Sequence, residues 1–376
     1  MDLLSNMIAA VTWQNMVMML VGALLLYLSI EKDFEPTLLL PMGFGTILVN
    51  LPLSSALDQM AGTEMVEGAL SMLFRLGIAT EILPLLILIA VGAMCDFGPL
   101  LANPKVFLFG LTAQMGIFLT MGIALLLGFN IYEAASIGII GAADGPTSIY
   151  VSTRFAPHLL GPISVAAYTY MALVPMIQPP VILAITTEKE RRMRMPAPAR
   201  TVKKRERILF PIAITILGGI IAPASVSLLG FVMFGNLLRE SGVTERLSQA
   251  AQNELANIVT ILLGFSIAAT MTGDKFVNIK TLIIIAMGLV AFVLDTAGGV
   301  MTAKLLNLFL PENKKVNPMV GAAGISAFPM SARTIQKLGQ KADPSNFLLM
   351  HAVGANVAGQ IGSVLAGGVL LAYLGG

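Results

Sequence analysis

Long apolar stretches separated by short polar breaks are the feature that most constrains how this chain can fold. A helix needs about 20 apolar residues to cross the hydrocarbon core of a bilayer. Only 12% of the 376 residues are charged and 56% are apolar, with a mean hydropathy of +0.84. The pattern predicts an all-α membrane protein, built as a polytopic helical bundle. The stretches that approach or exceed the spanning length are Trp13–Ile30, Leu38–Leu57, Ile82–Cys95, Val106–Phe129, Ser136–Val151, Ile163–Ile185, Ile208–Leu238, Ile258–Thr272, Leu282–Thr302, Val316–Met330 and Phe347–Leu374.

The composition also argues against several classes of function. The net charge of +2 is too small to favour nucleic acid binding. One cysteine, Cys95, cannot form an intrachain disulfide, and the two histidines, His158 and His351, offer no recognisable cluster for a transition metal. No nucleotide-binding glycine motif and no Ser-His-Asp arrangement is apparent. We therefore expect no redox chemistry, no zinc chemistry and no direct use of a nucleotide.

One hydrophilic segment, residues 188–207, interrupts the apolar pattern. It holds nine Lys or Arg residues and three Glu residues, a net charge of +6. Loops of this kind stay on the cytoplasmic side of a membrane. We therefore expect an N-terminal transmembrane helix in residues 1–33, a first repeat in 34–187, a basic cytoplasmic loop in 188–207 and a second repeat in 208–376. If each repeat crosses the membrane an odd number of times, the additional N-terminal helix places the N-terminus in the cytoplasm and the C-terminus outside.

The sequences before and after the basic loop match each other at three landmarks. The matched pairs share offsets of 178 to 180 residues, and they are Asp96 with Asp274, Gly141–Asp144 with Gly321–Gly324, and Arg154 with Arg333. A nearly constant offset predicts a duplicated unit. If each unit crosses the membrane an odd number of times, the two units are inverted repeats, which is typical of secondary transporters.

Two of the apolar stretches carry residues that interrupt helices. Residues 137–147 contain three glycines, one proline and the carboxylate of Asp144, and residues 317–333 contain further glycines and prolines and end in Arg333. Backbone groups freed by such breaks persist at membrane depth only where protein or a wet cavity satisfies them. We therefore expect broken or re-entrant helices that meet near the midplane of the bilayer.

Asp144 is the sharpest signal for a functional site. A carboxylate inside an apolar run costs on the order of 3 kcal/mol at a helix centre, and such residues usually bind an ion or a proton. Residues 145–148 add hydroxyl and carbonyl oxygens, the ligands that hard cations prefer. The alternative is a structural aspartate that caps the half-helix starting at Gly145. Asp96 and Asp274, at the ends of apolar stretches, are expected to be surface or cap residues.

Arg333 is the strongest candidate for binding an anion. A guanidinium group can hold a carboxylate through two parallel hydrogen bonds, so Arg333 with Ser326 could position a carboxylated substrate near the ion path. The alternative is an arginine that extends to the membrane surface. Arg154, at the matching position of the first half, is open to the same two interpretations.

Four further residues are weaker candidates. Tyr168 and Tyr170 would point about 200° apart on a helix, so at most one is expected to face a site, and an interfacial anchor is the alternative. Asn356 offers an oxygen ligand among small residues, where simple packing is the alternative. Asp295 could be a second ion or proton site, or could form a structural hydrogen bond to a broken helix.

The two interrupted motifs carry a resemblance to a known family. Gly141-Ala142-Ala143-Asp144-Gly145-Pro146-Thr147 and the segment from Gly321 to Arg333 resemble the beta subunits of the biotin-dependent, sodium-translocating decarboxylases, over essentially the whole chain. These enzymes are the oxaloacetate, methylmalonyl-CoA and glutaconyl-CoA decarboxylase sodium pumps.

The resemblance implies roles for individual residues. It places sodium binding at Asp144 with Thr147, Asn356 and Ser326 as further oxygen ligands. It places catalysis at Arg333, Ser326 and Tyr170, and binding of the carboxylated cofactor at Arg333 and Asn317.

The resemblance also implies an activity and partners. The chain would decarboxylate carboxybiotin and couple that reaction to export of Na⁺ across a bacterial inner membrane. The Met-Lys-Met sequence that usually carries biotin is absent here, so biotin would arrive on a partner. The expected partners are a carboxyltransferase (alpha) subunit, a biotin carrier and a small single-span gamma or delta subunit, with further copies of this chain in a homo-oligomer. The alternative function is a sodium-coupled secondary transporter of a carboxylate.

Overall fold

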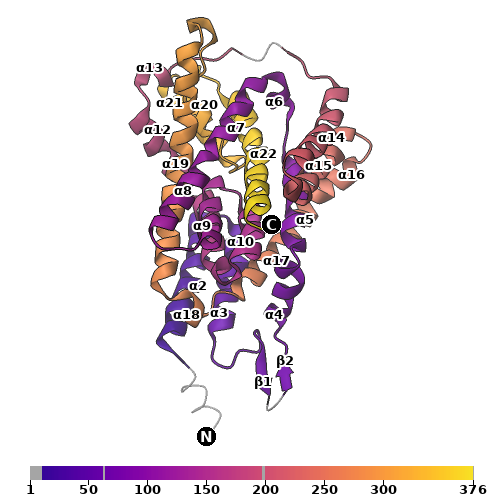
Figure 1. Ribbon diagram of the computed structural model, residues 1–376, viewed down its shortest axis with the longest axis vertical. Helices are drawn as coiled ribbons and strands as arrows, with labels where there is room; N and C mark the ends of the chain where they lie inside the picture. Colours follow the sequence, from indigo (N-terminus) through magenta and orange to yellow (C-terminus); the bar gives the residue numbers. More distant parts are fainter. Residues whose placement is uncertain (1–10, 62–63, 197–199, 376) are drawn as a thin grey trace.

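The computed structural model describes residues 11–61, 64–196 and 200–375 (Figure 1). Its first half contains α2 (Trp13–Lys32), α3 (Pro36–Asn50), β1 (Gln59–Ala61), β2 (Glu64–Val66), α4 (Ala69–Phe74), α5 (Ile82–Met94), α6 (Gly98–Ala102), α7 (Phe107–Ala113), α8 (Met115–Leu126), α9 (Ile131–Gly138), α10 (Gly145–Phe155), α11 (Leu160–Ala172), α12 (Val174–Ile185) and α13 (Glu188–Arg191). Its second half contains α14 (Lys204–Ile221), α15 (Val226–Ser241), α16 (Glu245–Ala250), α17 (Ala256–Ala268), α18 (Gly273–Phe276), α19 (Ile279–Phe309), α20 (Met319–Ala322), α21 (Met330–Ala342) and α22 (Leu349–Leu374).

Several of these helices are long and apolar enough to cross a membrane. Four qualify singly, and these are α2, the α7–α8 segment Pro104–Leu126, α19 and α22. Two more crossings come from helix pairs bent by 61° between α4 and α5 and by 69° between α11 and α12. Within the described residues, strands are confined to the short antiparallel pair β1 and β2. The prediction of an all-α polytopic membrane protein is confirmed.

The prediction of one continuous apolar stretch was wrong. Residues 208–238 read as a single apolar run, but the structure divides them into α14 and α15, which pack against each other as a hairpin. The turn lies at Ala222–Ser225, where Pro223 starts a short 3₁₀ segment. Proline lacks the backbone N–H that a continuing helix needs and clashes with the preceding turn, so the apolar run folds back.

Both interrupted motifs form broken helices, as predicted. In the first, α9 tightens into a 3₁₀ turn over Ile139–Ala142, Ala143 adopts a left-handed backbone with φ of +52°, and α10 starts at Gly145. In the second, α20 ends at Ala322 and α21 starts only at Met330. We refer to residues 131–155 as the first hairpin and to residues 317–342 as the second hairpin.

The two hairpins enter the protein from opposite ends of α19. This helix has 31 residues and is therefore about 46 Å long. Near its start, Lys280 pairs with Glu133 at the base of the first hairpin, at 3.4 Å. Near its end, Lys304 pairs with Glu190 of α13, at 3.1 Å. The base of the second hairpin lies at that end too, because Asp343 pairs with Arg194 at 2.7 Å.

The tips of the hairpins meet in the interior. The backbone N–H of Ser326 in the second hairpin donates to the carbonyl of Ala142 in the first, at 3.0 Å. This bond joins two segments that lie 184 positions apart in the chain and links the interrupted parts of both halves. The tips therefore hold each other at the depth where neither backbone can use water.

The packing of the other helices is also similar in the two halves. The α2–α3 pair corresponds to the α14–α15 pair, α3 packs against α17 and α15 packs against α5. A π-helical turn precedes both α5 and α17, at Arg75–Ala79 and Ala251–Leu255. The repeat boundaries remain a prediction, and this packing favours a first unit that includes α2, instead of an extra helix in residues 1–33.

Close helix crossings at glycine hold this framework together. A Cβ at Gly92 of α5 would lie 1.8 Å from the carbonyl oxygen of Val232 in α15, and one at Gly235 would lie 2.0 Å from that of Ile89. By contrast, nothing lies within 4 Å of the position that a Cβ would take at Gly122 of α8. Small residues allow helix backbones to approach closely in membranes, so Gly92 and Gly235 set the distance between α5 and α15.

Replacing Gly92 should therefore destabilise the protein. We expect Gly92→Ala to lower its stability by about 1–3 kcal/mol, because the new methyl group forces two backbones apart. Gly122→Ala is the matched control and should be neutral or slightly stabilising, because alanine favours the helix and has room. The measurement is the midpoint of thermal unfolding of the purified protein in detergent. Equal midpoints for the two variants would contradict this account of the crossing.

Candidate functional site

Asp144 lies at the start of α10, directly after the tip of the first hairpin. Its side chain is 4% exposed. The Oδ2 atom accepts hydrogen bonds from the hydroxyls of Thr147 and Ser363, each at 2.7 Å, and Oδ1 accepts one from the backbone N–H of Thr147 at 3.4 Å. Asp144 therefore caps α10, as the structural interpretation proposed. The cap leaves the charge of the carboxylate uncompensated.

No basic side chain neutralises this carboxylate. Within the part of the chain that the structure describes, no Lys, Arg or His forms an ion pair with Asp144. Burying a carboxylate away from water costs several kcal/mol even after relaxation, and two hydroxyl donors offset only part of that cost. The site is therefore electrostatically suited to a cation or a proton.

The tip of the second hairpin is held by hydrogen bonds to α22. The Ser326 hydroxyl donates to the carbonyl of Gly359 at 2.8 Å, the Asn356 amide donates to the carbonyl of Ile325 at 2.6 Å, and the Gln360 amide donates to the carbonyl of Ser326. These bonds use the nitrogen atoms of both amides. The Oδ1 atom of Asn356 and the Oε1 atom of Gln360 are buried and have no hydrogen-bond partner in the described part of the chain.

A cavity of about 260 Å³ lies between the two tips. Asp144, Ser326, Gln360 and Tyr168 line it, together with polar side chains from the start of α3 and from α17 and the π-turn that precedes it. Among the residues that the structure describes, no Lys, Arg or His lines it. A carboxylate with hydroxyl and amide oxygens is a suitable donor set for a hard cation such as Na⁺. The residues of the cavity therefore fit the cation that the sequence predicted.

The structure brings a different tyrosine to the cavity than the resemblance implied. The ring of Tyr168 packs against Gly145, where a Cβ would lie 2.1 Å from the ring carbon Cζ, and it lines the cavity. Tyr170 lies outside the cavity, and its hydroxyl donates to the carbonyl of Ile285 at 2.6 Å. The expectation that at most one of the two faces the site holds for this cavity. The assignment of catalysis to Tyr170 has no geometric support here.

Arg333 and Asn317 also lie outside the lining of this cavity. Arg333 is exposed in the first turn of α21 and has no ion-pair partner among the described residues. Asn317 lies at the base of the second hairpin, where its amide donates to the carbonyls of Arg191 and Met193 at 3.0 and 2.8 Å. The structure thus does not place Arg333 beside Asp144, and Asn317 fixes the basic loop against the second hairpin.

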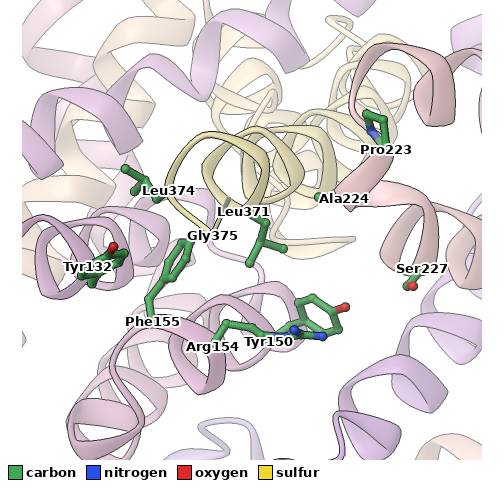
Figure 2. A pocket seen from close by; sticks show the side chains of 10 residues that line it. All are labelled: Tyr132, Tyr150, Arg154, Phe155, Pro223, Ala224, Ser227, Leu371, Leu374 and Gly375. Atoms are coloured by element: carbon green, nitrogen blue, oxygen red, sulfur yellow. The ribbon is translucent and has the colours of Figure 1, made fainter.

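Arg154 has a partner that Arg333 lacks. Its Nε and Nη2 atoms donate to the two carboxylate oxygens of Glu81, with Nη2 to Oε2 at 3.2 Å. Arg154 and Tyr150 lie side by side along α10 and line a separate cavity of about 670 Å³, with Ser227 of α15 across it (Figure 2). The two matched arginines therefore differ. Arg154 forms an ion pair with a carboxylate of the protein, whereas Arg333 forms none with the described residues.

Asp295 is buried in a different place. Its carboxylate packs against Gly116 and Gly141, where a Cβ would lie 2.0 Å from Oδ1 and 2.2 Å from Oδ2 respectively. Among the described residues neither oxygen has a hydrogen-bond partner, so the structural hydrogen bond to a broken helix that the sequence left open is not observed. Asp295 does not line the cavity between the tips. Asp96 accepts a bond from the backbone N–H of Gly98 at 2.8 Å, as expected of a cap residue.

Sequence analysis did not single out Ser363 or Gln360. With Asn356 these residues follow a spacing of four and seven positions along α22, which places polar atoms on one face of an otherwise apolar helix. That spacing was the sequence signal that could have identified Ser363 and Gln360. The sequence could not reveal that this face packs on the two tips.

Fold and site together define an ion-translocating membrane protein, with two opposed re-entrant hairpins and an acidic, oxygen-lined cavity between their tips. A family model described as the Na⁺-transporting oxaloacetate decarboxylase beta subunit matches residues 14–374. The chain belongs to this family.

Three relatives illustrate how close the match is. The glutaconyl-CoA decarboxylase subunit beta of Acidaminococcus fermentans is 52% identical over 98% of this chain and 95% of its own length. The methylmalonyl-CoA decarboxylase subunit beta of Veillonella parvula is 52% identical over 97% of this chain and 94% of its own length. The oxaloacetate decarboxylase beta chain of Klebsiella pneumoniae is 47% identical over 95% and 94%. The chain is thus a membrane subunit of a sodium-pumping decarboxylase, and an independent transporter is not favoured.

The contact between Ser363 and Asp144 generates a first test of the site. Ser363→Ala removes a hydrogen bond to a charged group, a loss of about 1.5–3 kcal/mol. We expect the sodium concentration that gives half-maximal decarboxylation to rise at least about tenfold. Ser152→Ala is the matched control, because Ser152 is equally buried in α10 and its hydroxyl has no partner. An unchanged sodium dependence in Ser363→Ala would remove this contact from the site.

Proposed function

We propose that this chain decarboxylates carboxybiotin, delivered by a partner subunit, and uses that reaction to export Na⁺. The observation that carries the proposal is the cavity between the hairpin tips, which contains Asp144 and no basic residue. A cation that reaches this cavity meets backbone and side chains from both hairpins. Because the hairpins enter from opposite ends of α19, movement of either tip would change the side from which the cation is reached.

The proposed sodium ligands are those that sequence analysis named, Asp144, Thr147, Asn356 and Ser326. Two observations support this set of ligands. Asn356 keeps a buried amide oxygen with no hydrogen-bond partner, and Ser326 lines the cavity with Asp144. We add Gln360, which lines the same cavity and whose Oε1 atom has no partner among the described residues. Together these residues supply one negative charge and several neutral oxygens, which suits a monovalent hard cation.

The proposed carboxylate-binding group is Arg333. It occupies the first turn of α21, where the partial positive charge of the helix already favours an anion and disfavours a basic side chain. A guanidinium there is best compensated by a ligand carboxylate, which it can hold through two hydrogen bonds. Asn317 holds the basic loop at the base of the same hairpin, so we propose a positioning role for it.

The proposed reaction breaks the bond between the carboxylate carbon and the ureido nitrogen of biotin. Carbon dioxide leaves, the electron pair stays on nitrogen, and one proton must be supplied there. Ser326 and a tyrosine are the proposed proton-handling groups, and Tyr168 is better placed than Tyr170 because only Tyr168 lines the cavity.

Coupling requires that the carboxylated ligand and Na⁺ bind the alternative states of the subunit unequally. A ligand shifts a two-state equilibrium only by the difference in its affinity for the two states. Moving one charge against 100 mV requires about 2.3 kcal/mol, a modest load for a decarboxylation. Arg333 belongs to the same hairpin as Ser326, which lines the cavity, so that hairpin is the proposed link between the two events.

The proposed partners are a carboxyltransferase (alpha) subunit, a biotin carrier and a small single-span gamma or delta subunit, with further copies of this chain. The basic loop of residues 188–207 is the proposed cytoplasmic side, because positively charged loops stay there. The base of the second hairpin joins this loop through Arg194 and Asp343. Arg333 is therefore reached from the side where a soluble carrier would arrive.

We propose a revised orientation for α2, the first described helix. Asn50 and the residues at the start of α2 contact Gly273, which precedes α19 and lies at the end away from the basic loop. In Figure 1 the start of α2 lies at the lower end of the molecule and α13 at the upper end. Five crossings separate them if the shorter apolar helix α3 also crosses and each bent pair counts once. The start of α2 and the C-terminal end of α22 then both face outward, whereas sequence analysis placed the N-terminus in the cytoplasm.

The proposed sodium site makes a direct prediction. Asp144→Asn should abolish the stimulation of decarboxylation by sodium in the purified complex, because the neutral amide no longer compensates the cation. Asp96→Asn serves as the control, since Asp96 is a cap residue outside the cavity, and it should keep the sodium dependence of the unmodified complex. Sodium stimulation that persists in Asp144→Asn would contradict the proposal.

The proposed role of Arg333 predicts a different defect. Arg333→Gln should slow decarboxylation about 100-fold, a loss of two charge-assisted hydrogen bonds, while the partner still carboxylates the carrier. Carboxylated carrier should therefore accumulate, which can be measured by its acid-labile carbon dioxide. Lys337→Gln is the matched control, because Lys337 is exposed one turn further along the same face of α21. Normal turnover in Arg333→Gln would exclude this residue from carboxylate binding.

A further inference from the structure

A second carboxylate lines the cavity that contains Asp144. Glu35 lies in the short connection between α2 and α3, directly before Pro36. It lines the same cavity of about 260 Å³ as Asp144, Ser326 and Gln360. Neither the sequence motifs nor the resemblance pointed to this residue. It comes from the helical framework around the hairpins and not from the hairpins themselves.

The carboxylate of Glu35 has no structural task. Glu35 stands at the N-cap position of α3, but its side chain forms no capping bond. Its backbone carbonyl accepts the first hydrogen bonds of the helix instead, from the N–H groups of Leu38 and Leu39 at 3.1 and 3.0 Å. No Lys or Arg among the described residues pairs with it. The residue also has a φ of +37°, a backbone conformation that disfavours a long side chain and persists only when its surroundings impose it.

Three neutral polar residues of the neighbouring framework line the same cavity as Glu35. Gln252 belongs to the π-turn before α17, and Asn257 and Thr260 belong to α17 itself. The amide nitrogen of Gln252 is used, since it donates to the Ser248 hydroxyl at 3.0 Å. With Glu35 these groups repeat the composition of the inner site, one carboxylate with amide and hydroxyl oxygens.

A buried amide on the cavity wall also indicates that the cavity shared by the two carboxylates is suited to a cation. Gln360 lines this cavity and is 3% exposed, and its Oε1 atom has no hydrogen-bond partner among the described residues. A buried acceptor without a donor is costly unless a cation or a water supplies the missing interaction. The cavity thus has two carboxylates, one unsatisfied amide oxygen and no basic lining residue.

We propose that Glu35, with Gln252 and Asn257, forms a second, weaker sodium site in this cavity, from which the ion passes to Asp144. Glu35 follows the C-terminal end of α2, about 30 Å from Trp13 at the start of that helix. Because the start of α2 lies away from the basic loop, Glu35 faces the side of the basic loop. Exported sodium must arrive from that side. Two weak sites in series let an ion enter and leave more readily than one deep site.

This inference rests on the proposed sodium site at Asp144, and the experiment separates the two. The complex is assayed for decarboxylation over a range of NaCl concentrations, with choline chloride added to keep the ionic strength constant. We expect Glu35→Gln to raise the sodium concentration for half-maximal activity roughly three- to tenfold, with a maximal rate within about twofold of the unmodified complex. The reason is that one of two charges attracting the cation is lost.

Glu31→Gln is the matched control. It removes the same charge four positions away, from an exposed residue of α2 that does not line the cavity, and it should leave the sodium dependence unchanged. Equal shifts in Glu31→Gln and Glu35→Gln would overturn the proposal, since they would reflect surface charge alone. No shift in Glu35→Gln would overturn it as well, even when Asp144→Asn abolishes sodium stimulation. Persistent stimulation in Asp144→Asn would instead overturn the proposed function.

A second variant keeps the test decisive if Glu35→Gln does not assemble. Glu35→Asp retains the charge, tolerates a positive φ better and shortens the side chain by one methylene group. We expect an intermediate shift in the sodium concentration for half-maximal activity. A sodium dependence in Glu35→Asp identical to that of the unmodified complex, at full assembly, would count against direct contact with the ion.

Discussion

The structure depends on how two interrupted backbones are satisfied inside a membrane. Carbonyl groups at the second hairpin tip accept hydrogen bonds from buried side-chain amides instead of water. Gln178 donates to Ala322 at 2.9 Å and Gln114 donates to Gly324 at 3.4 Å, and α22 supplies two further amides. Each unsatisfied group would cost several kcal/mol at this depth. These contacts therefore make it possible for irregular backbone and a cavity to exist in the core.

This arrangement concentrates function at one place. The amides of Asn356 and Gln360 satisfy the second tip through their nitrogen atoms, and their oxygens have no partner among the described residues, so the same residues that stabilise the break are the proposed ligands of a cation. Asp144 likewise caps α10 and contributes the charge of the site. The structural and the functional interpretations of Asp144 and Asn356 are consequently not alternatives. A helix break inside a membrane needs polar partners, and a cation site needs the same polar atoms.

The sequence predicted the features that depend on local chemistry. Glycine and proline identified both breaks, and a lone carboxylate in an apolar run identified Asp144. Features set by packing were not predictable in this way. Tyr168 and Tyr170 are two positions apart, and only the packing of α11 decides which one meets the cavity. The αα-hairpin of α14 and α15 was read as one stretch, because hydropathy records composition and not the turn at Pro223.

The central claim is that sodium is held between the hairpin tips at Asp144. The most direct measurement is a high-resolution map of the assembled complex prepared in sodium chloride and compared with one prepared in choline chloride. The account predicts density present only in sodium, in contact with the Asp144 carboxylate and with oxygens of α22. Sodium-dependent density at another place, with none beside Asp144, would contradict it.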